Sequence, residues 1–271
     1  MMMKVVYSPE CLGYDIPGHP ESPERVRRIH DALKEAGYTF IHAGPASKED
    51  VLLVHTPEHY NKIRKGSYGS ADVPMIDIKY PLLAAGVTIK ASDELSFALT
   101  RPPGHHASSS LEEGFCYFNN VAIAVKKRGQ KTAILDLDVH HGNGTQDIFM
   151  GSRNVIYVSL HQVPLYPMTG TRSQLNCHNF PLFPGTTEDA YMKNLEKALE
   201  VVSRFRPEIL AVSMGFDTYE KDPLGGQKVT AKGFGRIGKM ISGLGLPTFI
   251  ALEGGYSSDI GTLCRSFLDG F

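Results

Sequence analysis

Short apolar runs alternate with longer amphipathic segments along the whole chain. The apolar runs, rich in Val, Ile, Leu and Ala, predict strands at residues 5–7, 39–43, 95–100, 132–137, 155–160, 209–214 and 248–252. The amphipathic segments predict helices at residues 58–65, 82–92, 120–127, 188–205, 231–242 and 259–268. Ser22 followed by Pro23 is typical of a further helix start, and residues 66–74 predict a surface loop. Apolar strands separated by helices indicate an α/β fold with a parallel sheet covered on both faces.

Composition and charge narrow the class of protein. The 271 residues carry 28 basic and 29 acidic side chains, a net charge of −1 and 42% hydrophobic residues, which argues against direct nucleic-acid binding. No apolar run is long enough to span a membrane, and the N-terminus lacks a signal-peptide pattern. No repeat or linker divides the chain, so we expect one domain over residues 1–271. The cysteines form no Cys-x-x-Cys pair, which indicates a reduced, cytoplasmic protein; they are Cys11, Cys116, Cys177 and Cys264.

Polar or glycine-rich segments follow five of the predicted strands. They are residues 101–106, 136–140, 161, 215–217 and 253–256. In open α/β sheets, ligands bind in the crevice outside the carboxyl ends of the strands. We therefore expect these segments to meet at one edge of the sheet and to form the functional site.

The best candidate for a metal site follows the strand at residues 132–137. Asp138 and His140 lie two residues apart, so an extended backbone points both side chains to the same side. Asp217 supplies a third ligand, and three protein ligands leave an open position for water or substrate, as in catalytic zinc sites. The alternatives are a solvated strand end for Asp138 and His140, and a helix N-cap for Asp217.

The candidate catalytic groups surround this site. His105 and His106 lie in a loop restricted by proline and glycine, where they suit acid–base chemistry beside a metal better than ligation. Loop histidines satisfied by hydrogen bonds are the alternative. Asp136 can accept a hydrogen bond from one imidazole and so fix its tautomer. Tyr256 can donate its hydroxyl to a developing oxyanion, or otherwise mark a helix start. Together these residues predict metal-assisted hydrolysis of an unactivated carbonyl compound, most naturally an amide.

Four motifs in the chain are long and ordered: RPPGHHA at residues 101–107, GFCYFNN at 114–120, DLDVHHGNGTQ at 136–146 and EGGY at 253–256. They resemble the signatures of the histone deacetylase superfamily, which also contains acetylpolyamine amidohydrolases and acetoin-utilisation proteins. The resemblance extends from residue 19 to the C-terminal helix. Asn143 and the run Phe118-Asn119-Asn120 make the chain similar to the class II branch.

The resemblance implies an arginase/deacetylase-type three-layer α/β fold, in a single catalytic domain with a parallel sheet of about eight strands. It implies a zinc ion, or iron(II), held by Asp138, His140 and Asp217. It also implies that Tyr256 polarises the acyl carbonyl of the substrate.

The resemblance further implies a partner for each tandem histidine. In the family, the first histidine is backed by an Asp, here Asp136, and the second by an Asp or an Asn, here Asn143. An Asn partner cannot stabilise an imidazolium as a carboxylate does. We therefore expect His106 to be the main acid–base catalyst and His105 to act chiefly through its charge.

A structural potassium ion beneath the zinc is also implied. Its ligands match the Asp136 carboxylate, the Ser159 hydroxyl and the main-chain oxygens of Asp138, His140 and Leu160. A second cation site matches less closely, around Phe149, Ser152 and Val155.

Several residues match the walls of the family's acyl-lysine channel. They are Gly114, Phe115, Tyr166 (or Leu165), Leu224, Gly254 and Gly255. Arg25 matches an arginine that lines the interior route of acetate release. Without the resemblance, Phe115 and Tyr166 would be core aromatics, and Arg25 would be a charge on a helix surface.

One position bears on the substrate. A polyamine-selective branch has an acidic residue just beyond the Asp-Pro pair that follows the third zinc ligand, whereas here Leu224 follows Asp222-Pro223. This favours acyl-lysine or another neutral acylated substrate. Acetylpolyamines are the alternative, because Glu220 and Asp222 can attract a cation at the rim. The expected partner is thus an acylated small molecule or an acyl-lysine, and the oligomeric state stays open.

Two other functions share these features. Arginase-like binuclear manganese hydrolases need another carboxylate two residues after the histidine of the Asp-x-His turn, where this chain has Gly142. A catalytically silent acyl-group binding module would retain the pocket, but every catalytic residue of the family is present. The sequence therefore predicts a zinc-dependent amidohydrolase that removes acetyl or other short acyl groups from acylated amines by attack of an activated water.

Overall fold

A computed structural model describes residues 2–271 and, within them, one sheet of eight parallel strands. The strands are β1 (Val5–Tyr7), β2 (Phe40–His42), β3 (Phe97–Leu99), β4 (Thr132–Asp136), β5 (Val155–Gln162), β6 (Cys177–Leu182), β7 (Ile209–Met214) and β8 (Thr248–Leu252). Their order across the sheet is β2-β1-β3-β8-β7-β4-β5-β6. The predicted α/β class with a parallel sheet is confirmed, and β6 is the strand that the apolar pattern missed.

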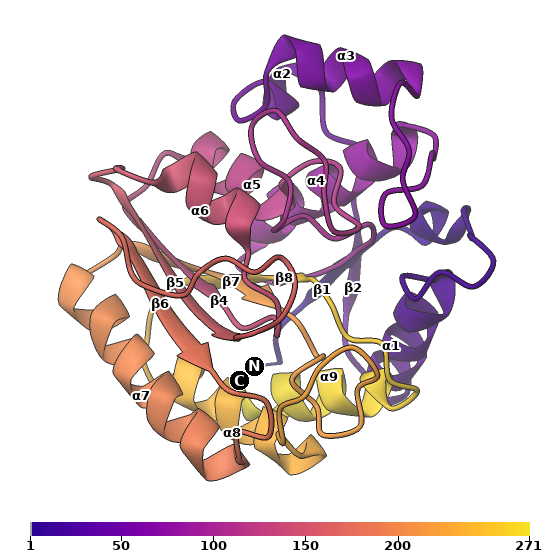
Figure 1. Cartoon of the computed structure of the whole chain (residues 1–271). Coiled ribbons are helices and arrows are strands. Elements are labelled where there is room, and N and C mark those ends of the chain that lie inside the picture. Colours follow the sequence, from indigo (N-terminus) through magenta and orange to yellow (C-terminus); the bar gives the residue numbers. More distant parts are fainter. Residues whose placement is uncertain (1) are drawn as a thin grey trace.

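Helices lie on both sides of the sheet and complete a three-layer molecule (Figure 1). One side carries α2 (Lys48–Val51), α3 (Pro57–Lys65), α4 (Lys79–Glu94), α5 (Asn120–Arg128) and α6 (Asn143–Phe149). The other side carries α1 (Pro23–Glu35), α7 (Glu188–Phe205), α8 (Ala231–Ser242) and α9 (Ile260–Gly270). A short 3-10 helix, η1 (Pro9–Leu12), follows β1. Across residues 2–271, none of the helices combines the length and the apolar character that a bilayer crossing requires.

The central strands are covered on both faces. Every residue of β4, β5, β7 and β8 is buried. A strand with no exposed face gains free energy from an apolar side chain at each position, at about 25 cal/mol per Å² of apolar surface removed from water. This is why these strands read as continuous apolar runs in the sequence.

The strand β6 is polar and contains Pro181. Within the described residues it pairs with β5 alone, so it forms an edge of the sheet. Proline lacks an N–H and is tolerated on an edge strand, where one side needs no ladder partner. The pattern of this strand is therefore too weak to recognise without its neighbour.

The short helix α6 begins at Asn143, inside a Gly-Asn-Gly run that is typical of a turn. A Cβ at Gly144 would lie 2.4 Å from the carbonyl oxygen of Ala107. The glycine therefore lets the helix start pass close to the loop of the tandem histidines. Packing, rather than helix propensity, selects this sequence.

Two predicted boundaries differ in detail. Ser22 occupies the N-cap position of α1 with extended backbone, and Pro23 follows it, but the Ser22 side chain makes no capping hydrogen bond within the described chain. The strand β3 is shorter than predicted because α4 continues to Glu94 and ends at Leu95, which has a left-handed φ of 51°.

The parallel arrangement brings the predicted chemistry together. The carboxyl ends of parallel strands share one edge of the sheet, so the segments after β3, β4, β5, β7 and β8 meet there. Asp136, the last residue of β4, is the register partner of Ser159 on β5 and of Ser213 on β7. The four cysteines are buried and have free thiols within the described part of the chain.

Candidate active site

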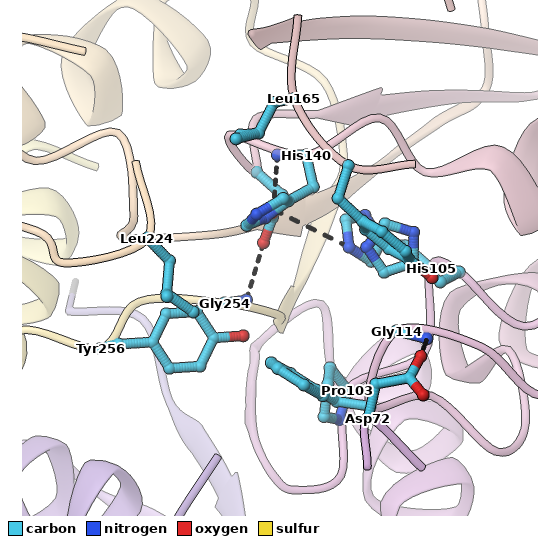
Figure 2. A pocket seen from close by; sticks show the side chains of 13 residues that line it. Asp72, Pro103, His105, Gly114, His140, Leu165, Leu224, Gly254 and Tyr256 are labelled. Carbon is cyan, nitrogen blue, oxygen red and sulfur yellow. Dashed lines mark hydrogen bonds and ion pairs between the residues drawn. The ribbon is translucent and has the colours of Figure 1, made fainter. Parts of the chain in front are cut away.

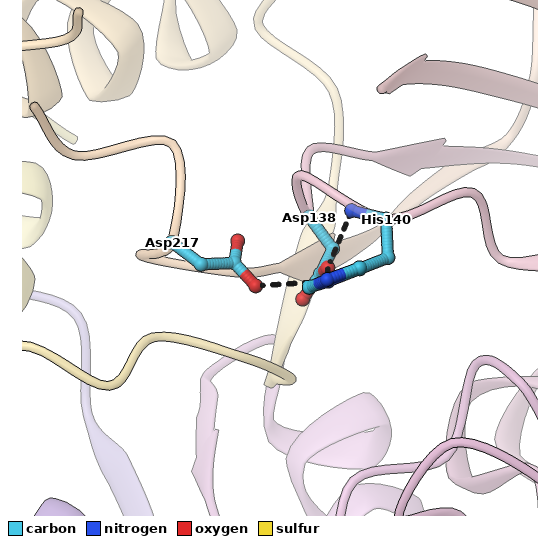
Figure 3. Close-up of side chains that lie close together, drawn as sticks. All are labelled: Asp138, His140 and Asp217. Atoms are coloured by element: carbon cyan, nitrogen blue, oxygen red, sulfur yellow. Dashed lines mark hydrogen bonds and ion pairs between the residues drawn. The ribbon is translucent and has the colours of Figure 1, made fainter. Parts of the chain in front are cut away.

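Three potential metal ligands converge where β4 and β7 end (Figure 3). Asp138 and His140 lie in the loop after β4, and Asp217 lies after β7. His140 Nδ1 is 3.0 Å from Asp138 Oδ1 and 3.3 Å from Asp217 Oδ2. One donor atom of each residue lies within 4.8 Å of the other two. The triad expected from the sequence is thus assembled as a candidate metal site.

Main-chain groups orient the two carboxylates. The N–H of Val139 donates to Asp217 Oδ1 and that of Gly254 donates to Asp138 Oδ2, each at 2.8 Å. A Cβ at Gly254 would lie 2.2 Å from Asp217 Oδ2, so this approach requires glycine. Asp217 lies well before the next helix, α8, and the N-cap interpretation is wrong.

The electrostatics of the triad fit a divalent cation. Burial and the charge of Asp138 raise the pKa of Asp217 to about 7. Burial opposes a charge on His140, but the Asp138 and Asp217 carboxylates raise its pKa to about 10. Asp217 Oδ2 is buried and accepts no hydrogen bond from residues 2–271. Two carboxylates and one imidazole, with one carboxylate oxygen unpartnered, are a donor set suited to Zn²⁺ or Fe²⁺.

The tandem histidines have different partners. Asp136 Oδ2 accepts from His105 Nδ1 at 3.1 Å and from the Tyr157 hydroxyl at 2.9 Å. His106 Nδ1 lies 2.7 Å from Asn143 Oδ1. The two imidazole centroids are 4.1 Å apart. Both histidine–partner pairs that the resemblance implied are therefore present.

These surroundings move the two histidine pKa values in opposite directions. Burial would lower the pKa of His105, but the charges of Asp136 and Asp138 raise it to about 10. Burial lowers the pKa of His106 well below its usual value, and the nearby His105 and His140 lower it further. These surroundings favour a charged imidazole at His105 and a neutral imidazole at His106.

A cavity of about 310 Å³ is lined by two members of the triad, Asp138 and His140 (Figure 2). It is lined by Asp72, Pro103, His105, His106, Gly114, Phe115, Asp138, His140, Leu165, Tyr166, Leu224, Gly254 and Tyr256. Five predicted channel residues are among them, and Leu165 lies beside Tyr166. The exception is Gly255, whose carbonyl oxygen faces away and accepts a hydrogen bond from Arg25 Nε. Tyr166 is 38% exposed and Phe115 is half-buried, so neither is a core aromatic.

Tyr256 points its hydroxyl into this cavity (Figure 2). The Arg25 guanidinium lies 4.8 Å from the centre of the Tyr256 ring and donates to the carbonyl oxygens of Glu253 and Gly255, each at 2.6 Å. Arg25 is buried, so the interpretation as a surface charge is wrong. Tyr256 lies outside α9, so its interpretation as a helix start is wrong as well.

Asp222 does not contribute a charge to the rim. It is buried, and its carboxylate accepts main-chain N–H groups from Tyr256 at 2.7 Å, Ser257 at 3.2 Å and Leu224 at 2.9 Å. The expectation that Asp222 attracts a cation at the rim is wrong, because its charge holds the chain around Tyr256. Glu220 is exposed.

Asp72 is a cavity residue that the sequence did not predict. It lies in the irregular segment 66–74, which was expected to be only a surface loop, yet it lines the cavity. Its Oδ2 accepts from the N–H of Gly114 at 3.3 Å, and its main-chain oxygen accepts from the N–H of Phe115 at 3.0 Å. A lone acidic residue in an irregular segment gives no signal in the sequence.

Glu253 was part of the EGGY motif but had no assigned role. Its Oε2 accepts from the N–H of Gly104 at 2.8 Å and of His105 at 3.3 Å, and its Oε1 accepts from the Ser213 hydroxyl at 3.0 Å. Glu253 is fully buried and joins the histidine loop to β7 and β8. Its place directly after an apolar strand was the available signal.

The residues expected at the cation sites lie at and beside the strands β4 and β5. The Asp136 and Ser159 side chains project from paired positions of β4 and β5, and the Ser159 hydroxyl is 2.9 Å from His161 Nδ1. At the weaker second site, the carbonyl oxygens of Phe149 and Val155 accept from Nδ2 of Asn176, at 2.9 and 2.8 Å. An amide donor therefore already serves these two oxygens.

Known proteins resemble this chain in sequence. The histone deacetylase domain family matches residues 19–268. A probable deacetylase of Archaeoglobus fulgidus is 37% identical over 95% of this chain and 82% of its own length. A histone deacetylase-like amidohydrolase of Pseudomonas aeruginosa is 35% identical over 91% of this chain and 75% of its own length. An acetylpolyamine amidohydrolase of Burkholderia pseudomallei is 41% identical over 70% of this chain and 60% of its own length.

Solved structures resemble it in fold. A crystal structure of an acetylpolyamine aminohydrolase from Burkholderia pseudomallei has a TM-score of 0.92 and 28% identity, over 99% of this chain and 98% of that chain. The crystal structure of the HDA15 HD domain has a TM-score of 0.92 and 32% identity, over 98% of this chain and 86% of that chain. The domain match, the identities and the assembled metal triad show that this chain is a deacetylase-type enzyme of the histone deacetylase family.

Proposed function

We propose that the protein is a zinc-dependent deacetylase that removes acetyl or other short acyl groups from acyl-lysine, and that residues 1–271 form one catalytic domain. The observation that carries the proposal is a single cavity. Two members of the metal triad, Asp138 and His140, line it together with the two histidines of unlike partners and Tyr256. The reaction is hydrolysis of an amide to a carboxylate and an amine.

Asp138, His140 and Asp217 would hold the metal. When bound, the ion supplies a Lewis acid that lowers the pKa of water and polarises the acyl carbonyl. Iron(II) suits the same donor set. The remaining steps belong to the side chains of the chain itself.

His106 is the proposed general base. Its Nδ1 is engaged by Asn143, so Nε2 is free to take a proton from the attacking water and to return it to the leaving amine. His105, held charged by Asp136, stabilises the negative charge that develops on the substrate. The Tyr256 hydroxyl donates to the acyl oxygen as that charge grows.

Arg25 is the proposed guide for acetate release. A second cavity, of about 180 Å³, is lined by both Arg25 and Tyr256, and Tyr256 also lines the cavity at the triad. A buried guanidinium next to such a cavity is suited to attract a small carboxylate. The proposed potassium site, at Asp136, Ser159 and the main-chain oxygens of Asp138, His140 and Leu160, would support the loop that carries Asp138 and His140.

The apolar Leu224 in the cavity wall supports a neutral acyl-lysine stem over a polyamine. An acetylpolyamine is the second candidate, because the Asp72 carboxylate also lines the cavity and can pair with a distal ammonium group. The buried free thiols of the described chain support a reducing compartment such as the cytoplasm.

A substrate panel tests the proposal. Zinc-loaded protein is assayed with acetyl-lysine peptides, longer acyl-lysines and acetylated polyamines, with a chelator as control and Tyr256→Phe as the inactive comparison. We expect the highest kcat/KM on an acyl-lysine and loss of turnover with the chelator. Higher kcat/KM on an acetylpolyamine would select the second candidate, and no turnover with zinc bound would contradict both. Elemental analysis should give one divalent metal per chain, since a binuclear enzyme would give two.

A further inference from the structure

We propose that Glu113 is a positioning residue that fixes the orientation of the Asn143 amide and, through it, the tautomer of His106. The inference rests on the proposed role of His106 as the general base. Glu113 directly precedes the GFCYFNN motif and does not line the cavity, so it has no role of its own in the chemistry described above.

A tight turn holds Glu113 in place. Its N–H and C=O exchange hydrogen bonds with those of Cys116, at 3.1 and 2.9 Å. The two residues between them, Gly114 and Phe115, both have positive φ values, 53° and 68°. A phenylalanine in this region is uncommon and is retained where the surroundings demand it. The Asp72 contacts to both N–H groups add two further restraints, so the direction of the Glu113 side chain is constrained.

Asn143 connects Glu113 to His106. Its Nδ2 donates to Glu113 Oε2 at 2.8 Å, and its Oδ1 lies 2.7 Å from His106 Nδ1. An ionised carboxylate only accepts hydrogen bonds, so the NH₂ group must face Glu113 and the amide oxygen must face His106. An amide oxygen also only accepts, so Nδ1 must carry the imidazole proton. Nε2 is then left with its lone pair, which is the form that a general base needs.

Without an acceptor-only neighbour, the Asn143 amide has two orientations. The flipped amide would present its NH₂ group to His106 Nδ1 and stabilise the tautomer with the proton on Nε2, which cannot accept another. Asp136 behind His105 has no donor and needs no such control. Because Asn143 has an amide with two possible orientations, one of them must be selected, and Glu113 selects it.

The same carboxylate also lies beside a cavity wall. Burial and then the charge of Glu113 raise the pKa of Tyr166, so its hydroxyl stays protonated next to this carboxylate. A Cβ at Gly114 would lie 2.5 Å from His106 Cδ2 and 3.0 Å from Tyr166 Cε1. The turn thus packs directly on the general base while presenting Glu113 to Asn143.

The first test reads the tautomer without any substrate. Nitrogen-15 NMR of histidine-labelled, zinc-loaded protein is recorded for the wild type, for Glu113→Gln and for His106→Ala, which identifies the His106 signals. We expect the wild type to have the proton on Nδ1 and Glu113→Gln to show a mixture, because a glutamine can both accept and donate. An unchanged His106 tautomer in Glu113→Gln would overturn the proposal, whatever the enzyme's substrate is.

The second test asks whether Glu113→Gln changes kcat in opposite directions in the wild-type and Asn143→Asp backgrounds. In the wild-type background, Glu113→Gln should lower kcat about threefold to tenfold with little change in KM, because a neutral glutamine that can also donate no longer biases the Asn143 amide toward one orientation. Asn143→Asp alone places two carboxylates within hydrogen-bond distance and should also lower kcat. In the double variant, the glutamine amide introduced at position 113 can donate to the acceptor-only carboxylate introduced at position 143. Adding Glu113→Gln to Asn143→Asp should therefore raise kcat.

Exposed Glu196, on α7, provides the matched control for loss of a carboxylate. Glu196→Gln should leave kcat and the His106 signals unchanged. Equal losses from Glu113→Gln in both backgrounds, without reversal, would show that Glu113 acts only through stability and would reject the positioning role. Absence of turnover in the wild type as well as in every variant would contradict the proposed function, while the tautomer measurement would still decide the role of Glu113.

Discussion

His105 and His106 are adjacent in the sequence, and their side-chain partners make them chemically unequal. His105 pairs with the Asp136 carboxylate and is held charged, whereas His106 meets the Asn143 amide and stays neutral. A neutral imidazole can take a proton from water, and a charged one stabilises negative charge. The difference of one side-chain group, between Asp136 and Asn143, is thus the basis of the two roles proposed for the histidines.

Removal of each histidine tests this separation. His106→Ala should lower kcat by roughly 10²–10⁴, the usual contribution of a general acid–base group, and His105→Ala should lower it much less. The measurement is steady-state turnover of an acetyl-lysine substrate by zinc-loaded protein, with metal content checked for each variant. Equal losses would contradict the division of roles.

Gly114 is a second residue where one atom decides function. An added Cβ would meet His106 and Tyr166, so Gly114→Ala should lower kcat by more than about tenfold, the effect of roughly 1.4 kcal/mol on the barrier. Gly129 has a similar φ of 67° with nothing within 4 Å of the added atom. Gly129→Ala should therefore lower stability by about 1 kcal/mol and keep kcat. Thermal melts and turnover of both variants separate strain from site damage, and full activity in Gly114→Ala would refute the contact argument.

At the scale of elements, Glu253 connects separate parts of the fold. It follows β8, binds the Ser213 hydroxyl on β7, and accepts the main-chain N–H groups of Gly104 and His105 in the loop after β3. This buried carboxylate accepts three hydrogen bonds, and it therefore holds the histidine loop against the ends of β7 and β8. The loop is therefore positioned by a contact between elements, in addition to its own proline and glycine.

Glu253 also predicts a pH dependence of stability. Burial raises its pKa from 4.5 to about 7, so the folded state binds an extra proton between these values. Its contribution to stability is thus present below the unfolded value and is lost as pH rises toward 7. Glu253→Gln should gain stability over the wild type as pH rises through this window, by at most about 3 kcal/mol.

Urea unfolding of both proteins at about pH 4.5, 6 and 8 measures this effect, since these values bracket the window in which the proton is lost. The difference in unfolding free energy between the two proteins cancels the titration of the groups that both contain. Glu196→Gln serves as the exposed control and should follow the wild type at each pH. Parallel pH profiles for Glu253→Gln and the wild type would contradict the prediction.

At the scale of the whole molecule, the site depends on the order of strands in the sheet. Asp138 and His140 follow β4, and Asp217 follows β7, which is separated from β4 by two intervening strands in the sequence but adjacent to it in the sheet. The triad therefore forms only when β4 and β7, which are far apart in the sequence, pair in the sheet. Metal binding and folding are linked for this reason.

Zinc should stabilise the folded protein through this linkage. Free zinc at about 1,000 times its dissociation constant adds about 4 kcal/mol, so the melting temperature should rise with zinc and fall with a chelator. Asp217→Asn, which weakens one ligand, should lose most of this response. The measurement is a thermal melt at several free zinc concentrations. An equal response in Asp217→Asn would show that zinc binds elsewhere.

Much of this molecule could be predicted from local pattern. Apolar runs and helix periodicity predicted seven of the strands and most helices. The central strands β4, β5, β7 and β8 are buried on both faces, so their sequences are almost continuously apolar. The i, i+2 spacing of Asp138 and His140 predicted half of the metal site. The edge strand β6 and the helix α6 were not predicted, because contacts with neighbouring elements stabilise them more than their own sequences do.

The sequence by itself determined the fold class, the family resemblance and the residues able to bind metal and move protons. Only the tertiary structure decided which of these groups touch. Local pattern does not predict three of the contacts described above. They are those of Asp72 with the cavity, of Glu253 with the histidine loop and of Glu113 with Asn143. Local pattern records which surface of an element is buried, whereas hydrogen bonds between distant segments depend on the order of strands in the sheet. That order is a property of the whole chain.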